Sequence, residues 1–213
     1  MPEQPTDPTR RTYGGLSKAY AFFNARLFDD RLPACLITMQ RRAKAYGYFA
    51  GRRFTTPDLI EVTDEIALNP RHFAERSDEA TLATLVHEMV HLRQAHFGIA
   101  SRTGYHNQEW AGMMRAVGLI PTDTGEPGGK STGQRVTHWI EPGGRFALAC
   151  AELIEEHGFR VPYVETRNDT EREARERKAA SKTRYTCPTC GVNAWAKPGT
   201  RLACGACNLP LVV

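Results

Sequence analysis

Apolar residues in the first half of the chain follow two periods. Residues 13–28 carry four large apolar side chains at spacings of three and four, which are Leu16, Tyr20, Phe23 and Leu27. This helical period predicts an amphipathic helix. The segments 36–39 and 47–54 are rich in aromatic and β-branched side chains, which favours strands, and a third strand is expected at 59–63. The short apolar run 66–70 is expected to be a strand end, because its proline cannot continue a central strand.

The pattern further along the chain predicts three more helices and one more strand. Ser77 is a good N-cap, acidic residues follow it in the first turn, and Gly98 is a good stop, so we expect a helix between them. A second helix is expected at 107–117, where apolar side chains share one face. The remaining expected segments are a Gly- and Pro-rich loop at 121–134, a strand at 136–140 and a helix at 145–157.

The composition divides the chain into four parts. Residues 1–12 contain three prolines and are expected to form a disordered tail. Residues 13–164 are numerous enough for a domain with a core. Between residues 165 and 184 apolar side chains almost vanish while Glu, Arg and Lys alternate, which favours a charged helical linker. Residues 185–213 are too few for a hydrophobic core, so we expect them to fold around a metal.

The overall composition is that of an ordinary globular protein. Of the 213 residues, 41% are hydrophobic and 24% are charged, which excludes wholesale disorder. No apolar run approaches the roughly 20 residues that a membrane span needs, and the N-terminus lacks the apolar core of a signal peptide. We therefore expect a cytoplasmic protein that makes no membrane contact.

The helix predicted after Ser77 carries the sequence His-Glu-Met-Val-His at residues 87–91. Residues four apart lie one above the other on a helix, so His87 and His91 can bind one metal ion while Glu88 faces the same cleft. A catalytic zinc lowers the pKa of its bound water, and Glu88 can take the proton as that water attacks a carbonyl carbon. The alternative is an ordinary amphipathic helix with two incidental histidines.

A catalytic zinc needs a third protein ligand. The later part of the chain contains five candidates for this ligand, which are His96, His106, Glu109, His138 and His157. The metzincin pattern is excluded, because Gln94 and Phe97 occupy the positions where it requires Gly and His. His96 is rotated away from the ligand face of the helix. We favour His106, which follows a turn with two glycines, and Glu109 is left as an orienting residue or an alternative ligand.

The segments His87 to His91 and Gly104 to Trp110 together resemble the SprT-like metallopeptidase family, which includes the Spartan-type proteases. That family has a third histidine about fifteen residues after the second, followed by a Glu and an aromatic residue, and this chain has His106, Glu109 and Trp110 there. The segments 24–33, 47–49 and 66–70 also look like that family. The resemblance covers roughly residues 13–119.

The resemblance implies a compact zincin-like α+β fold of the minigluzincin type, followed here by a small C-terminal zinc β-ribbon. It implies that His87, His91 and His106 bind the catalytic zinc and that Glu88 is the general base. In such folds an edge strand near the helix pairs with an extended peptide substrate, and residues 66–69 are the candidate stretch here. Some members of the family act on proteins crosslinked to DNA, which makes DNA an expected partner.

The last thirty residues or so contain two Cys-x-x-Cys pairs. The cysteines are Cys187, Cys190, Cys204 and Cys207, with thirteen residues between the pairs. This spacing is typical of two zinc knuckles that close a four-cysteine ribbon, and four thiolates leave no open position for catalysis. We expect a structural zinc, with a redox role as the alternative. Cys35 and Cys150 are expected to be small buried side chains.

The net charge of +4 and the pI near 8.8 permit contact with nucleic acid without requiring it. Four basic residues precede the ribbon, and they are Arg177, Lys178, Lys182 and Arg184. Together with Trp195 they are a candidate surface for single-stranded DNA, whereas the alternative is a solvated linker with Trp195 packed on the ribbon. The basic and aromatic residues of 41–53 leave two interpretations open as well, a nucleic-acid surface and a solvated strand face. The segment 128–131 resembles a phosphate-binding loop, but Thr124 replaces the required first glycine, so no nucleotide cofactor is expected.

These observations predict a zinc-dependent metalloendopeptidase with one catalytic and one structural zinc ion. The expected substrates are proteins associated with or crosslinked to DNA. Two alternatives stay open, which are a nucleic-acid-binding regulator whose zinc site has little or no turnover, and a zinc hydrolase of another amide. The intact Glu88 favours hydrolysis, because a purely structural site needs the histidines but not the base.

Overall fold

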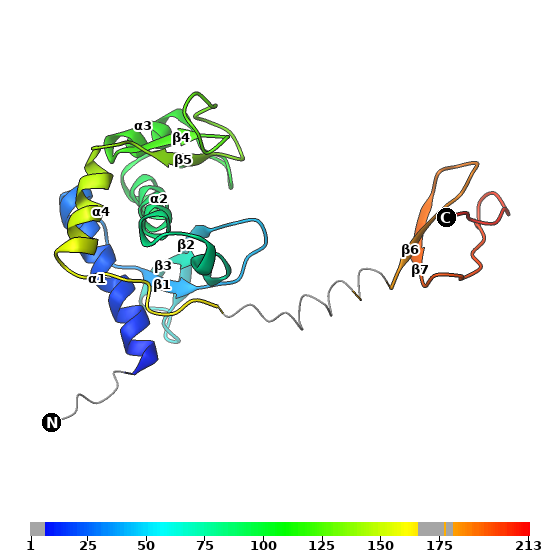
Figure 1. Ribbon diagram of the computed structural model, residues 1–213, viewed down its shortest axis with the longest axis horizontal. Helices are drawn as coiled ribbons and strands as arrows, with labels where there is room; N and C mark the ends of the chain where they lie inside the picture. The colour runs from blue at the N-terminus through cyan, green and yellow to red at the C-terminus, as the bar shows by residue number, and fades with distance from the viewer. Residues whose placement is uncertain (1–6, 166–176, 178–180) are drawn as a thin grey trace. The chain divides into compact units, whose positions relative to one another are not determined.

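The structure is a computed structural model, and it describes residues 7–165, 177 and 181–213. The chain forms two compact units, Met1–Glu165 and Thr166–Val213, which are treated separately below (Figure 1). The predicted charged helical linker at 165–184 lies largely outside the described residues. No helix in the described part of the chain has the length and apolar character needed to cross a membrane.

The first helix, α1, spans Pro8–Phe28 and begins five residues earlier than predicted. Asp7 caps it by accepting a hydrogen bond from the backbone N–H of Thr9, and Pro8 occupies the first turn, where a missing N–H costs nothing. The predicted tail of residues 1–12 is therefore wrong for residues 8–12. The predicted apolar face is confirmed, because Leu16, Tyr20, Phe23 and Leu27 are buried.

A three-stranded sheet follows, with strand order β1-β3-β2. Strand β1 (Leu36–Met39) runs parallel to β3 (Val62–Leu68), and β2 (Gly47–Thr55) runs antiparallel to β3. The prediction of a third strand at 59–63 is only partly right, because Leu59 lies in the turn with a positive φ of 62°.

The prediction that residues 66–69 form a free edge is wrong. Ile66, Ala67 and Leu68 pair with β1 on one side and with β2 on the other, so they belong to the central strand. Pro70 is compatible with this position, because it starts the short 3-10 helix η1 (Pro70–Glu75) after the last ladder residue. In the described sheet the outer edges belong to β1 and β2.

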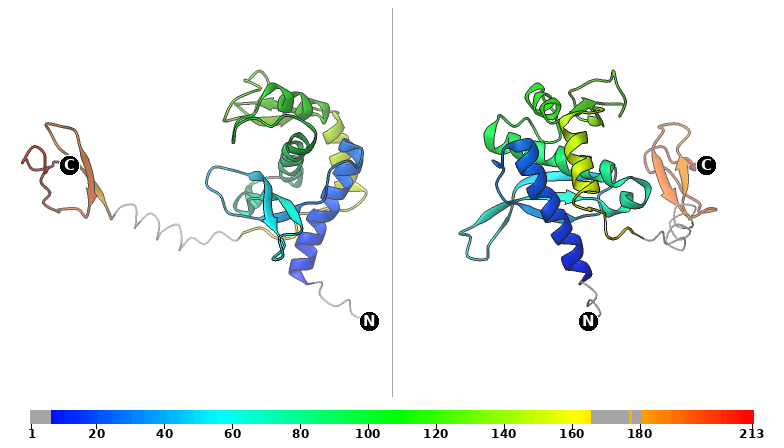
Figure 2. Two further views of the ribbon diagram at one scale, coloured as in Figure 1. Left: turned by 180° about the vertical axis from the view of Figure 1, so that it is seen from behind. Right: turned by 60° about the vertical axis from the view of Figure 1, so that its left-hand side comes forward.

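Helix α2 spans Asp78–Phe97 with Ser77 as its N-cap and Gly98 as its C-cap, which confirms the predicted ends. It packs against β2 and β3 as well as against α1, α3 and α4. Its apolar side chains fill the centre of the core, and Leu82, Leu85, Val86, Met89 and Val90 are buried. Figure 1 shows α2 between the sheet and the later elements, and Figure 2 shows the same arrangement from behind.

The rest of the first unit consists of two helices and a hairpin. Helix α3 (Gln108–Ala116) leads into β4 (Leu119–Thr122), which pairs antiparallel with β5 (Thr137–Ile140), and α4 (Arg145–Glu155) follows. The predicted helices and the strand near 136–140 are confirmed, whereas β4 was not predicted. Gly118 makes the turn before β4 with a φ of 82°, and a Cβ there would lie 2.9 Å from the backbone nitrogen of Arg145.

The second unit is a small β-ribbon. Strands β6 (Thr183–Thr186) and β7 (Asn193–Ala196) pair antiparallel, so strand structure begins two residues before the predicted boundary at residue 185. Tyr185 is buried, and its hydroxyl donates to the carbonyl oxygen of Lys197 at 3.0 Å. With so few buried apolar side chains, the ribbon depends on its cysteines for stability.

Candidate metal centres

Three histidines meet beside the middle of α2. His87 and His91 are one helical turn apart, and His106 comes from the segment just before α3. Each offers a ring nitrogen, and these three atoms all lie within 4.8 Å of one another. The Nε2 atoms of His91 and His106 are 3.2 Å apart. The structure therefore brings together the three residues predicted as ligands of the catalytic zinc.

Trp110 supports this triad from within the core. Its side chain is fully buried, and its ring stacks on that of His91 with an interplanar angle of 22° and a centroid distance of 5.2 Å. The ring centroids of His106 and His87 lie 4.2 Å and 5.0 Å from the ring centroid of Trp110. Because Trp110 touches all three imidazoles, the apolar core of the domain holds their planes in place.

Two of the three histidines have a partner for their other ring nitrogen. The Nδ1 of His106 lies 3.1 Å from the carbonyl oxygen of Gly133, which can only accept, so His106 donates there. The Nδ1 of His87 lies 3.0 Å from the Nδ1 of His138 on β5. His138 was weighed only as a possible third ligand, and the structure places it beside His87 and outside the triad.

The environment keeps the triad imidazoles neutral, which is the form that binds a metal. Burial, helped by the neighbouring His106, lowers the pKa of His91 to about 3. Burial also lowers the pKa of His87 well below its usual value, with contributions from the other histidines. The pKa of His106 is lowered by burial, although its hydrogen bond to Gly133 acts in the opposite direction.

Glu88 is buried between α2 and β2. Burial raises the pKa of its carboxyl to about 8, and the backbone amide of Phe49 partly opposes this shift. A Cβ at Gly47 would lie 3.3 Å from the Glu88 Oε1, so the start of β2 passes directly over the carboxyl. A carboxyl in such a dry, protected position can exchange a proton near neutral pH.

The other predicted ligand candidates have different partners. His96 lies 2.7 Å from Asp64, through its Nε2 and a carboxylate oxygen. Glu109 accepts hydrogen bonds from the side chain of Gln94 and from the backbone N–H of Ile99, both at 2.8 Å. His157 lies near Glu152 with its ring against Phe22. None of the three is within the triad group of the described residues.

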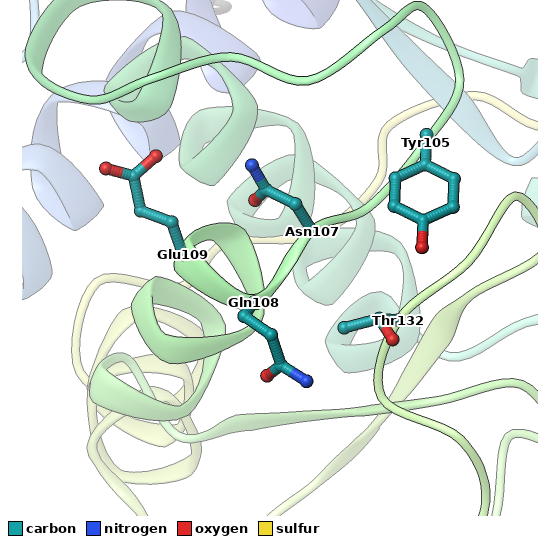
Figure 3. A pocket seen from close by; sticks show the side chains of 5 residues that line it. All are labelled: Tyr105, Asn107, Gln108, Glu109 and Thr132. Carbon is teal, nitrogen blue, oxygen red and sulfur yellow. The ribbon is translucent and has the colours of Figure 1, made fainter.

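A shallow pocket of about 380 Å³ lies beside the third histidine. It is lined by Tyr105, Asn107, Gln108, Glu109 and Thr132, whose side chains surround it in Figure 3. Asn107 has a structural role, because it accepts from the backbone N–H of Trp110 and donates to the carbonyl of Ile99. Neither Glu88 nor His87 lines this pocket, so it flanks the triad rather than containing it.

The four cysteines of the ribbon form a second cluster. One sulfur from each of Cys187, Cys190, Cys204 and Cys207 lies within 4.8 Å of the others. The two halves are built alike, because Gly191 and Asn208 each have a positive φ and donate to the carbonyl of the first cysteine of their pair, at 3.0 Å and 2.8 Å. This repeated turn places both pairs facing one another, as zinc knuckles require.

The local backbone favours a thiolate at the first cysteine. The backbone amides of Cys190 and Thr189 lower the pKa of the Cys187 thiol to about 6. A metal ligand must lose its proton, so this turn is prepared for a cation. Four such ligands would leave no open coordination position, which assigns a structural role to any metal held there.

Trp195 lies on the surface of the ribbon. Its side chain is 62% exposed, and it is paired across the strands with Arg184. The interpretation that Trp195 packs onto the ribbon therefore has little support.

In the first unit, the guanidinium of Arg42 lies 4.9 Å from the Tyr48 ring centre. The glycine-rich segment 128–131 lies in the loop between β4 and β5, not between a strand and a helix.

An α+β domain with a His-Glu-x-x-His helix, a third histidine before the next helix and a separate four-cysteine ribbon defines a metallopeptidase-like class of protein. The model of the SprT-like family matches residues 16–127, which is more than half of the chain, and the protein belongs to that family. It is also similar to the "Uncharacterized protein in mucB 3'region" of Salmonella typhimurium, with 48% identity over 59 residues that cover 28% of this chain and 80% of that protein. No solved structure matches.

Proposed function

We propose that the protein is a zinc-dependent metalloendopeptidase. The observation that carries the proposal is a buried carboxyl, Glu88, on the same helix as two of three converging neutral histidines. Three imidazole nitrogens on one side of a site are the donor set of catalytic zinc, which keeps its fourth position open. A zinc ion held by His87, His91 and His106 would supply a bound water of lowered pKa and polarise the substrate carbonyl.

Glu88 is the proton carrier in this proposal. Its carboxylate removes a proton from the attacking water and returns it to the nitrogen of the leaving amine as the peptide bond breaks. The dry surroundings and the raised pKa of about 8 suit both steps, because the protonated form is stable enough to act as the acid. Trp110 and the outer hydrogen bonds hold the histidines still during the reaction.

We assign the peptide-binding edge to β2. It lies at the border of the described three-stranded sheet, and its first residue, Gly47, passes over the Glu88 carboxyl. An extended peptide could pair with the free backbone groups of such an edge, which gives affinity without selecting a sequence. This replaces the assignment to residues 66–69, which are paired on both sides.

We also propose that the substrates are proteins bound or crosslinked to DNA. The ribbon supports this, since the exposed Trp195 ring and the neighbouring Arg184 form a surface on which an unpaired base could stack. A second zinc ion on the four cysteines would hold that surface together. Thiolate ligands of this kind suit a reducing compartment, so we propose a cytoplasmic location.

The same exposed Trp195 supports a second function, which is a nucleic-acid-binding regulator whose triad has little or no turnover. Such a protein would need the ribbon and the histidines but would not need Glu88. The two functions are distinguished by the effect of changing Glu88 alone.

The test is cleavage of a DNA-binding protein by zinc-loaded wild type and Glu88→Gln, with and without single-stranded DNA. We expect cleavage by wild type, faster with DNA, and none by Glu88→Gln at the same zinc content. Glu79→Gln, an exposed change on the same helix, is the matched control and should cleave like wild type. Cleavage by Glu88→Gln, or by no form under any condition, would overturn the peptidase, and DNA binding without cleavage would favour the regulator.

A further inference from the structure

His138 is a partly buried histidine that the proposed peptidase mechanism does not use. It lies on β5, more than thirty residues from the nearest triad histidine in the sequence. Its Nδ1 is 3.0 Å from the Nδ1 of His87, and the two ring centres are 5.2 Å apart. Its ring nitrogens are not among the converging atoms of the triad. His138 is therefore not placed as a ligand of the triad's metal site.

The contact determines which nitrogen of His87 is free for a metal. A neutral imidazole has one N–H donor and one acceptor, so the two Nδ1 atoms at 3.0 Å must have opposite roles. If His87 donates its Nδ1–H to His138, its Nε2 carries the lone pair that a metal needs. If His138 donates instead, His87 carries the proton on Nε2 and cannot bind through that atom.

The third ligand is oriented in the same way and by the same part of the fold. The Nδ1–H of His106 donates to the carbonyl of Gly133, which leaves its Nε2 facing the Nε2 of His91. Gly133 lies in the loop between β4 and β5, and His138 lies on β5. The hairpin of residues 119–140 thus reaches two candidate ligands that come from different parts of the chain, α2 and the segment just before α3.

We propose that His138 is a positioning residue that fixes the tautomer and ring orientation of His87, and that the β4–β5 hairpin is part of the metal site. A ligating histidine commonly donates its second nitrogen to an outer acceptor, and losing that acceptor weakens metal binding. In this protein the acceptor is an imidazole rather than the usual carboxylate or carbonyl. The inference rests on the proposed zinc site at the triad.

The experiment measures the zinc affinity of the triad in the full chain by competition with a chelator. Two variants are compared. His138→Leu fills the space of the imidazole with an apolar side chain and removes the acceptor. In His138→Asn the side-chain oxygen can replace Nδ1 as the acceptor. His157→Ala is the matched control, because His157 is a half-exposed histidine that contacts Phe22 and Glu152. Cobalt substitution adds a spectroscopic measurement, since the thiolate band of the ribbon serves as an internal standard within each sample.

We expect His138→Leu to weaken zinc binding at the triad by about tenfold to a hundredfold. His138→Asn should recover most of that loss, and the thiolate band should be unchanged throughout. A cobalt spectrum of wild type and His138→Asn with the same coordination number would support a positioning role. The two variants should remain folded, which circular dichroism would show.

Three results would overturn the inference. Unchanged zinc affinity in His138→Leu would make His138 a packing residue only. A loss in His138→Asn as large as in His138→Leu would remove the acceptor role, and a change of cobalt coordination number in both would make His138 a ligand. Failure of wild type to bind zinc at the triad is a different outcome, because it would remove the proposed function itself.

Discussion

Gly47 is the residue that allows β2 to approach the Glu88 carboxyl. A Cβ at this position would lie 2.8 Å from the backbone oxygen of Ala67, 2.9 Å from the Cγ2 of Thr84 and 3.3 Å from the Oε1 of Glu88. The first two distances are shorter than real contacts, and Ala67 belongs to a paired central strand that cannot easily move. The close approach of strand and helix therefore requires glycine here.

We predict that Gly47→Ala lowers both stability and turnover. The added methyl group must displace Thr84 or β2, and overpacking of this kind costs about 1–3 kcal/mol of unfolding free energy. The shift also changes the position of Glu88, so peptide cleavage should fall more than the folded fraction does. Urea unfolding followed by circular dichroism, together with a cleavage assay, measures both effects.

The control is Gly112→Ala, because Gly112 lies on the exposed side of α3 and a Cβ there would meet nothing within 4 Å. Alanine is the better helix former by about 1 kcal/mol, so this variant should be slightly more stable with unchanged cleavage. Equal stability of Gly47→Ala and wild type would show that β2 does not lie as close to the helix as described.

Two of the three triad histidines could be predicted from local spacing, whereas the partner of His87 could not. The third, His106, was favoured among five candidates for its place after a turn and by the family resemblance. His87 and His91 share a helix face because of their separation in the sequence, and their convergence needs no knowledge of the rest of the fold. The position of His138 depends on how β5 pairs with β4 and on where that hairpin meets α2. Such long-range pairing has no local signal.

The two helices of the site are held at their first turns by side-chain caps. Ser77 accepts from the backbone N–H of Ala80 at the start of α2. Asn107 accepts from the backbone N–H of Trp110 at the start of α3, and it also accepts from Gln94 on α2. Asn107 therefore fixes the end of one helix against another, directly next to the third histidine.

We predict that Asn107→Ala and Ser77→Ala lose similar stability but differ in metal binding. Losing a cap costs about 1 kcal/mol in either helix. Only Asn107→Ala removes a side chain adjacent to His106, so only this variant should also weaken zinc binding at the triad. Chemical denaturation and chelator competition on the same samples separate the two effects. Equal zinc affinity of both variants would show that His106 is held by Gly133 and Trp110 alone.

Helix ends could be predicted from the sequence where a cap was present, and strand order could not. Ser77, Gly98 and Asn107 mark helix ends in the structure as predicted. The start of α1 was missed because the prolines of the N-terminus were interpreted as a disordered tail, although Pro8 is well placed in a first turn. The strand end predicted before Pro70 is confirmed, because β3 stops at Leu68. The edge position of 66–69 came from the family resemblance, and it is wrong because this run pairs on both sides.

The two units of the molecule are stabilised by different forces. The first unit has a continuous apolar core, in which residues such as Phe23, Leu85, Trp110 and Phe146 are fully buried. Among the described residues of the second unit few side chains are buried, and two of the buried residues are the metal-ligand candidates Cys187 and Cys204. Removal of bound metal ions should therefore change the stability of the two units by different amounts.

We predict that a strong chelator unfolds the ribbon and leaves the first unit folded. Without metal, nothing links the four cysteines, and the ribbon has too little buried apolar surface to remain folded. Hydrogen exchange measured by mass spectrometry should show loss of protection at Thr183–Thr186 and Asn193–Ala196, with α2 still protected. Persistent protection of the ribbon after zinc removal would contradict a metal-dependent fold there.

We propose two separate zinc centres, one of histidines and one of cysteines, and the proposed activity and the further inference depend on them. Native mass spectrometry of the zinc-saturated chain counts them at once, in wild type, in His91→Ala and in a Cys187→Ser, Cys204→Ser variant. The account predicts two zinc ions in wild type and one in each variant, with the surviving ion in a different unit each time. A wild-type chain that binds only one zinc ion at saturation, or a His91→Ala variant that still binds two, would contradict it.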